Sequence, residues 1–127
     1  MKNRLAIIFF LSMTFAGLVI AQVAPLNTSS KATLMADCIG VFQGHKSAVQ
    51  SPELGEVLTR NSEVAGDLAI KFGEQEGLTR DYLNQIRKSR YQSTMNGIRQ
   101  SSNPGQFLAQ NTNLVSECRK YMNNFSK

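Results

Sequence analysis

The chain has 127 residues, with 14 lysines and arginines against 9 aspartates and glutamates, two cysteines and one histidine. This length suits one domain with one hydrophobic core. Two thiols and one imidazole are too few for a zinc site, which takes about four ligands. No motif brings together a nucleophile and a base, so we expect a protein that is not an enzyme and has no metal ion or cofactor.

Residues 1–21 have the pattern of a secretory signal peptide. A short positively charged segment precedes an apolar stretch that reaches Ile20, and Val19 and Ala21 are the small residues that signal peptidase requires. The stretch is shorter than the ~20 apolar residues of a membrane-spanning helix. We predict cleavage after Ala21 and export to the periplasm, or alternatively to the medium, with no integral membrane segment after processing. The alternative to cleavage is that residues 1–21 are retained as an N-terminal membrane anchor.

Removal of the signal peptide changes the charge balance. Twelve of the 14 basic side chains then remain against 9 acidic ones, a net charge of +3. Residues 31–81 carry 5 basic and 8 acidic side chains, whereas residues 82–127 carry 7 basic and 1 acidic. An exported chain without a recognised binding motif is not expected to bind nucleic acid, so the uneven charge needs another explanation.

The mature chain opens with residues 22–29, which include Pro25 and a run of small polar residues and are predicted to be a flexible lead-in. A single helical domain follows over residues 30–127. Its first helix is predicted over 31–50, with Ser30 as N-cap. The second opens at Ser51-Pro52, a capping residue followed by proline at the first helical position, and ends at glycines 73 and 77.

Two further helices are predicted from the apolar spacing of the C-terminal half. The third starts after Thr79 and ends near Ser102. The fourth is capped by Asn103, next to Pro104, and reaches Phe125. Short links between four such helices predict an all-α, antiparallel four-helix bundle with up-down-up-down topology.

The cysteines give a test of this fold. Cys38 and Cys118 both lie on inward apolar stripes, each about 10 Å from the same end of the bundle at ~1.5 Å rise per residue. We therefore predict a disulfide that joins the first and last helices, as is typical of exported proteins. The alternatives, redox catalysis or a metal site, lack the close Cys-x-x-Cys spacing and further ligands that they need.

Three polar residues, His45, Asn61 and Asn111, also fall on inward stripes. They form either a hydrogen-bond network that selects helix pairing or the lining of a polar pocket. Haem is not expected, because the bundle register does not bring His45 close to a methionine.

Arg87, Lys88, Arg90 and Tyr91 form a basic stretch with an aromatic residue, a candidate site for an acidic partner. The alternative is neutralisation by the preceding helix, in which Glu63 would face Arg90 in an antiparallel hairpin.

Gly40 and Gly44 are four residues apart on one helix face. They indicate either close contact with another helix of the bundle or a face for a homodimer.

Three functions are considered. The first is a small periplasmic protein that binds another exported protein without catalysis, as an inhibitor, immunity factor or adaptor. The second is an acid- or envelope-stress chaperone that exposes apolar helix faces when its carboxylates are protonated. The third is a bundle that binds a small ligand.

Overall fold

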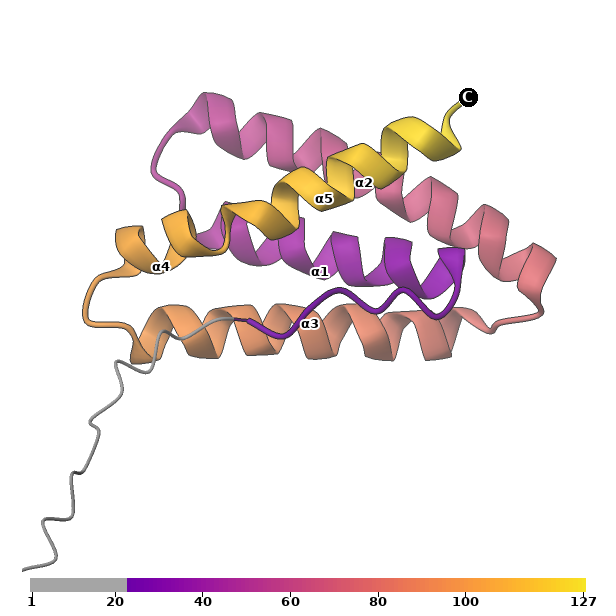
Figure 1. Ribbon diagram of the computed structural model, residues 1–127, viewed down its shortest axis with the longest axis horizontal. Helices are drawn as coiled ribbons and strands as arrows, with labels where there is room; N and C mark the ends of the chain where they lie inside the picture. Colours follow the sequence, from indigo (N-terminus) through magenta and orange to yellow (C-terminus); the bar gives the residue numbers. More distant parts are fainter. Residues whose placement is uncertain (1–22) are drawn as a thin grey trace, which may run out of the picture.

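The computed structural model describes residues 23–127; the predicted signal peptide lies outside this part of the chain. The described residues form helices and no strand (Figure 1). The helices are α1 (Lys31–Ala48), α2 (Pro52–Glu76), α3 (Arg80–Gln100), α4 (Pro104–Gln110) and α5 (Thr112–Phe125). α1, α2, α3 and the α4–α5 pair alternate in direction, which confirms the predicted all-α bundle. Between residues 23 and 127 no helix combines the length and hydropathy needed to cross a bilayer.

Local signals determine where the helices begin and end. Each of four helix starts is capped by a side-chain oxygen that accepts a backbone N–H of the first turn, which satisfies one of the free donors there. These caps are Ser30, Ser51, Thr79 and Asn103, as the sequence predicts. α2 ends at Gly77, whose φ of 70° is left-handed and therefore favours glycine.

The predicted fourth helix is interrupted at Asn111, which separates α4 from α5. The Asn111 side chain donates from Nδ2 to the carbonyl oxygen of Phe107 at 2.8 Å, and its Oδ1 accepts the Val23 N–H at 3.1 Å. Asparagine side chains compete with the helix backbone for such partners. Asn111 therefore departs from helical backbone angles, and its side chain connects the end of α4 to Val23 at the start of the described residues.

α1 occupies the centre of the molecule. It packs along α2 on one side and α3 on the other, whereas α2 and α3 diverge from the turn at Gly77 (Figure 1). α5 crosses the same face of this three-helix layer along which residues 23–30 run. α1 is consequently buried on most of its circumference, and Met35, Val41 and Phe42 are completely enclosed in the core.

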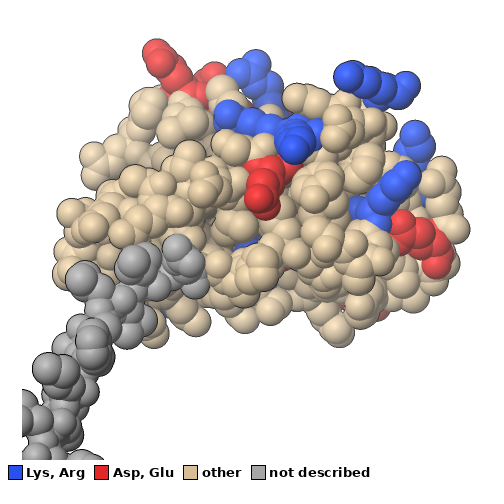
Figure 2. All heavy atoms as spheres, in the orientation of Figure 1, with Lys and Arg blue, Asp and Glu red and all other residues tan. Residues whose placement is uncertain are grey.

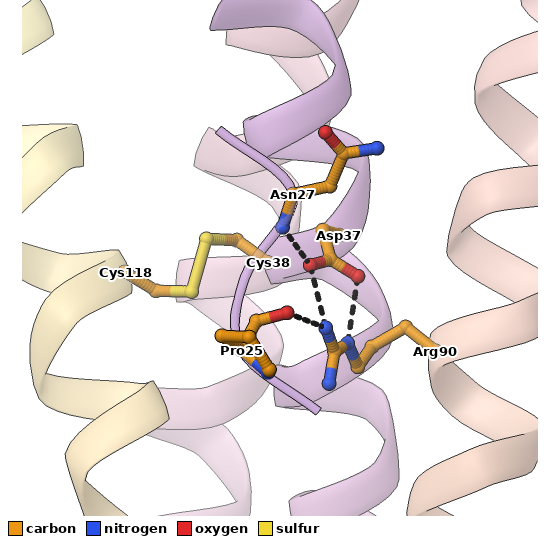
Figure 3. The surroundings of a disulfide bond; sticks show 6 residues. All are labelled: Pro25, Asn27, Asp37, Cys38, Arg90 and Cys118. Atoms are coloured by element: carbon orange, nitrogen blue, oxygen red, sulfur yellow. Dashed lines mark hydrogen bonds and ion pairs between the residues drawn. A yellow bond between two sulfur atoms is a disulfide. The ribbon is translucent and has the colours of Figure 1, made fainter. Parts of the chain in front are cut away.

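The disulfide Cys38–Cys118 joins α1 to α5, with 5.6 Å between the two Cα atoms (Figure 3). Both cysteines are fully buried. The predicted covalent link between the first and last helices is therefore confirmed.

Gly40 and Gly44 lie where α1 meets α3. A Cβ atom on Gly40 would come within 2.6 Å of the Arg87 carbonyl oxygen, and one on Gly44 within 2.5 Å of Thr94 Cγ2. Only glycine permits helices to approach this closely. Of the two interpretations of this face, the structure places it in a close helix contact within the chain, and both glycines are buried there.

Candidate partner-binding groove

An elongated groove follows α1 on the side turned away from Cys38. α2 and α3 both line its apolar end, α3 alone lines its middle, and α2 alone lines its far end by the α1–α2 turn. Its apolar end is a hollow of about 200 Å³ with Ala36 and Ile39 on the floor. Gly66 and Ile70 form the α2 wall there, and Ile70 is 40 % exposed. The groove exists because α2 and α3 diverge on either side of α1.

The groove continues along α1 through two further hollows. The middle hollow, about 410 Å³, is lined by Gln43, Lys46, Ser47, Arg87 and Tyr91. Arg87 also lines the apolar end, and Lys46 also lines a third hollow of about 580 Å³ by the α1–α2 turn. Each hollow therefore shares one lining residue with the next hollow along α1.

The α3 wall and the floor of the groove are basic. Arg87 donates from Nη1 to Gln43 Oε1 at 2.9 Å and from Nε to Asn84 Oδ1 at 3.2 Å, so its guanidinium is held over the floor. Within residues 23–127 no carboxylate comes within ion-pair distance of Arg80, Arg87 or Lys46. These three cations are therefore available to an anionic partner.

The α2 wall contains two glycines that are not needed for any close contact among the described residues. A Cβ atom on Gly55 would meet nothing within 4 Å, and one on Gly66 would lie 4.0 Å from Ile39 Cδ1. A glycine in a helix interior costs ~1 kcal/mol relative to alanine. Both glycines leave this wall open to close approach from outside.

The basic stretch of α3 divides between two environments. Arg87 and Tyr91 line the groove, and Lys88 is exposed. Arg90 is 7 % exposed and points to the other side of α3, where it forms a two-point ion pair with Asp37 of α1 at 2.7 and 2.9 Å (Figure 3). Arg90 is therefore a structural residue and not part of the groove.

The predicted pairing of Glu63 with Arg90 is wrong. α1 separates α2 from α3, and the described residues contain no ion pair between those two helices. The alternative in which α2 neutralises the basic stretch of α3 fails for the same reason.

Residues 23–30, which we call the strap, lie against α1 and α3 (Figure 1). Arg90 donates to the carbonyl oxygens of Ala24 and Pro25 at 2.6 and 2.7 Å, and the Asn27 N–H donates to Asp37 Oδ2 at 2.8 Å. Leu26 is 8 % exposed and belongs to the core. These contacts differ from the flexible lead-in predicted for this part of the chain.

The three inward polar residues do not share one environment. Asn111 bonds to Val23 and Phe107 as described above. His45 is buried, and this burial lowers the pKa of its imidazole. Asn61 is half-buried with an Nδ2 that has no hydrogen-bond partner among the described residues. Asn111 thus bonds to the strap and to α4.

The opposite face of the layer offers a different surface (Figure 2). In this view its charged side chains lie over the upper and right-hand parts, and the lower part that no grey atoms cover is largely uncharged. An aromatic cluster of Phe72, Tyr121 and Phe125 lies at one end of this face, with the Lys31 ammonium 5.3 Å from the Phe72 ring centre. Lys31 thus occupies the aromatic faces itself.

In the described part of the chain, no three histidine, cysteine, aspartate or glutamate side chains gather as metal ligands would. The groove also contains no histidine or cysteine along its length. Comparisons of the chain with protein-family models, with curated proteins and with solved structures found no match.

Proposed function

We propose that this protein is exported and binds another exported protein in the groove along α1, without catalysing a reaction. An inhibitor, immunity factor or adaptor would act in this way. The observation that carries the proposal is the groove itself: a floor that is apolar at one end, beside three cations that pair with no carboxylate among residues 23–127. A surface of this kind is typical of an interaction site.

The compartment proposed is the periplasm. A disulfide between two fully buried cysteines is typical of an oxidising compartment. The signal-peptide pattern of residues 1–21 agrees with this location.

The chaperone hypothesis is favoured less. It has two grounds, the acidic side chains of α2 and their ion pairs with α3, and the described residues do not make those ion pairs. A small-ligand site is favoured less than a protein interface, since the groove is long and open along its length rather than enclosed.

The test uses the tagged mature protein, purified from the periplasm under oxidising conditions, in three forms. Gly66→Leu fills the groove at a position where the chain leaves room for a side chain. Asn113→Leu is the matched control, because it adds the same side chain to an exposed position of α5. Circular dichroism and thermal melts establish that all forms fold.

We expect a stoichiometric partner that accompanies the wild type and Asn113→Leu but is lost with Gly66→Leu. In calorimetry, the purified partner should bind the wild type and Asn113→Leu with similar affinity and Gly66→Leu much more weakly. A partner that binds Gly66→Leu as well as the wild type, or no partner at native expression levels, contradicts the proposal.

A further inference from the structure

Resting on the proposed function, we infer that the groove takes an amphipathic α-helix of the partner, with carboxylates about seven residues apart along one flank. The carboxylates face α3, and the apolar stripe of the same helix covers Ile39 and Ile70. This inference names the chemistry of the partner, which the proposed function leaves open.

The spacing of the cations sets the spacing of the carboxylates. Arg80 and Arg87 are seven residues apart on α3, which places them about 10 Å apart along the helix. Lys46 lines the same hollow as Arg87, whose guanidinium bonds to Gln43, three residues before Lys46 on α1. Lys46 therefore lies about one helical turn beyond the Arg87 guanidinium. A helix repeats one flank every seven residues, a rise of about 10 Å, and therefore matches the spacing of Arg80 and Arg87, with Lys46 close to the second carboxylate.

The walls of the groove favour a helix over an extended segment. Both walls and the floor are helices, whose backbone groups are already bonded within each helix. An extended segment would leave its own N–H and C=O groups without partners against the apolar part of the floor at Ala36 and Ile39. A helix satisfies these groups internally and presents only side chains.

The α2 wall gives the occupant an orientation. Glu56 and Glu63 line the hollow by the α1–α2 turn, together with Arg60 and Lys46. The hollows along α3 are lined by Arg80 and Arg87 and by no carboxylate, so the acidic flank is directed towards α3. Gly55 and Gly66 let the other flank of the occupant approach α2 closely, because an added Cβ at either position meets ordinary contact or open space.

The same two glutamates argue against a polyanion as the occupant. A phosphate-rich surface or a nucleic acid is negative on every side and would meet Glu56 and Glu63 as well as the cations. A helix that is acidic on one flank alone avoids this repulsion.

The test uses the oxidised mature protein and two synthetic peptides of about 21 residues. Both are designed as amphipathic helices with one apolar stripe of leucine and alanine. One carries glutamate at three positions seven residues apart beside the stripe, and the other carries glutamine there. Binding is measured by fluorescence anisotropy at ~0.15 M salt, which screens long-range charge effects.

We expect the glutamate peptide to bind at least about tenfold more tightly than the glutamine peptide, since charged hydrogen bonds are worth about 1.5–3 kcal/mol. Arg87→Gln should weaken the glutamate peptide by about tenfold, and Gly66→Leu should abolish its binding. Arg119→Gln is the control, because it removes a cation from the exposed surface of α5.

Four results would overturn the inference. The first is equal binding, or no binding, of the two peptides. The second is a loss of binding with Arg119→Gln equal to the loss with Arg87→Gln, and the third is Arg87-dependent binding to anionic vesicles or duplex DNA that is tighter than binding to the glutamate peptide. The fourth is self-association of the protein in sedimentation that Gly66→Leu removes. The last result would make a second copy of this chain the occupant. If Gly66→Leu loses the natural partner while the acidic peptide fails to bind, the proposed function stands and this inference fails.

Discussion

Glycines occur in two kinds of environment in these helices, and alanine substitution distinguishes them. At Gly40 an added methyl group would collide with the backbone of α3, whereas at Gly55 it would enter open space. We expect Gly40→Ala to destabilise the protein by about 1–3 kcal/mol through overpacking, and Gly55→Ala to stabilise it by about 1 kcal/mol through helix propensity. Urea unfolding of both variants measures the difference; effects of the same sign would show that the α1–α3 contact is looser than described.

His45 makes stability depend on pH. Burial lowers the pKa of its imidazole below the value of about 6.5 in the unfolded chain. Between these two values the unfolded state binds more protons than the folded state, so the stabilisation present above pH 6.5 is lost as the pH falls towards the folded pKa. We expect the free energy of unfolding to fall between pH 6.5 and 5.

The control for this prediction is His45→Gln, which cannot titrate. His45 is the only histidine in the chain. In the variant, the free energy of unfolding should therefore stay constant with pH at values above those at which carboxylates titrate. Equal slopes for the wild type and the variant would show that the imidazole is solvated in the native state.

At the scale of elements, the strap is a part of the core. Leu26 is buried against it, and the strap carbonyls accept hydrogen bonds from Arg90. We expect Leu26→Ala to destabilise the domain by about 2 kcal/mol. Thermal or chemical unfolding measures this effect. An unchanged stability would mean that the segment is the flexible lead-in that its composition suggests.

Helix ends were predictable because their signals are local. Each cap at Ser30, Ser51, Thr79 and Asn103 needs only one side chain and the N–H groups that follow it. The interruption at Asn111 was not predictable in this way, because its side chain is held by Val23, which is 88 residues away in sequence. Periodicity alone therefore predicts one helix where the chain forms two.

At the scale of the whole molecule, the disulfide limits the freedom of the unfolded chain. Cys38 and Cys118 are separated by 80 residues, for which the chain-entropy model gives a stabilisation of up to about 4.5 kcal/mol. That is a large part of the ~5–15 kcal/mol typical of a domain. We expect Cys118→Ser to lower the melting temperature by more than about 10 °C. A melt unaffected by reducing agent would contradict this.

The groove could not be predicted from the sequence, although Arg87 and Tyr91 were identified as candidates. The register of a square bundle places α2 beside α3 and pairs Glu63 with Arg90. Gly40 and Gly44 instead allow α3 to pack directly against α1, so that α1 lies between α2 and α3. Arg90 consequently forms its ion pair with Asp37 of α1 and not with Glu63 of α2. Because α1 lies between α2 and α3, Arg80 and Arg87 of α3 stay without carboxylate partners from α2, and the α2 wall of the groove stays open.

The most direct test of the binding groove is photocrosslinking in cells that export the protein. A photoreactive phenylalanine analogue is placed at Tyr91 or Ile70 in the groove walls, or at Asn113 or Arg119 on α5. The groove account predicts one discrete adduct with another protein from the two groove positions and none from the two α5 positions. Adducts only from α5, or equally from both faces, would contradict it.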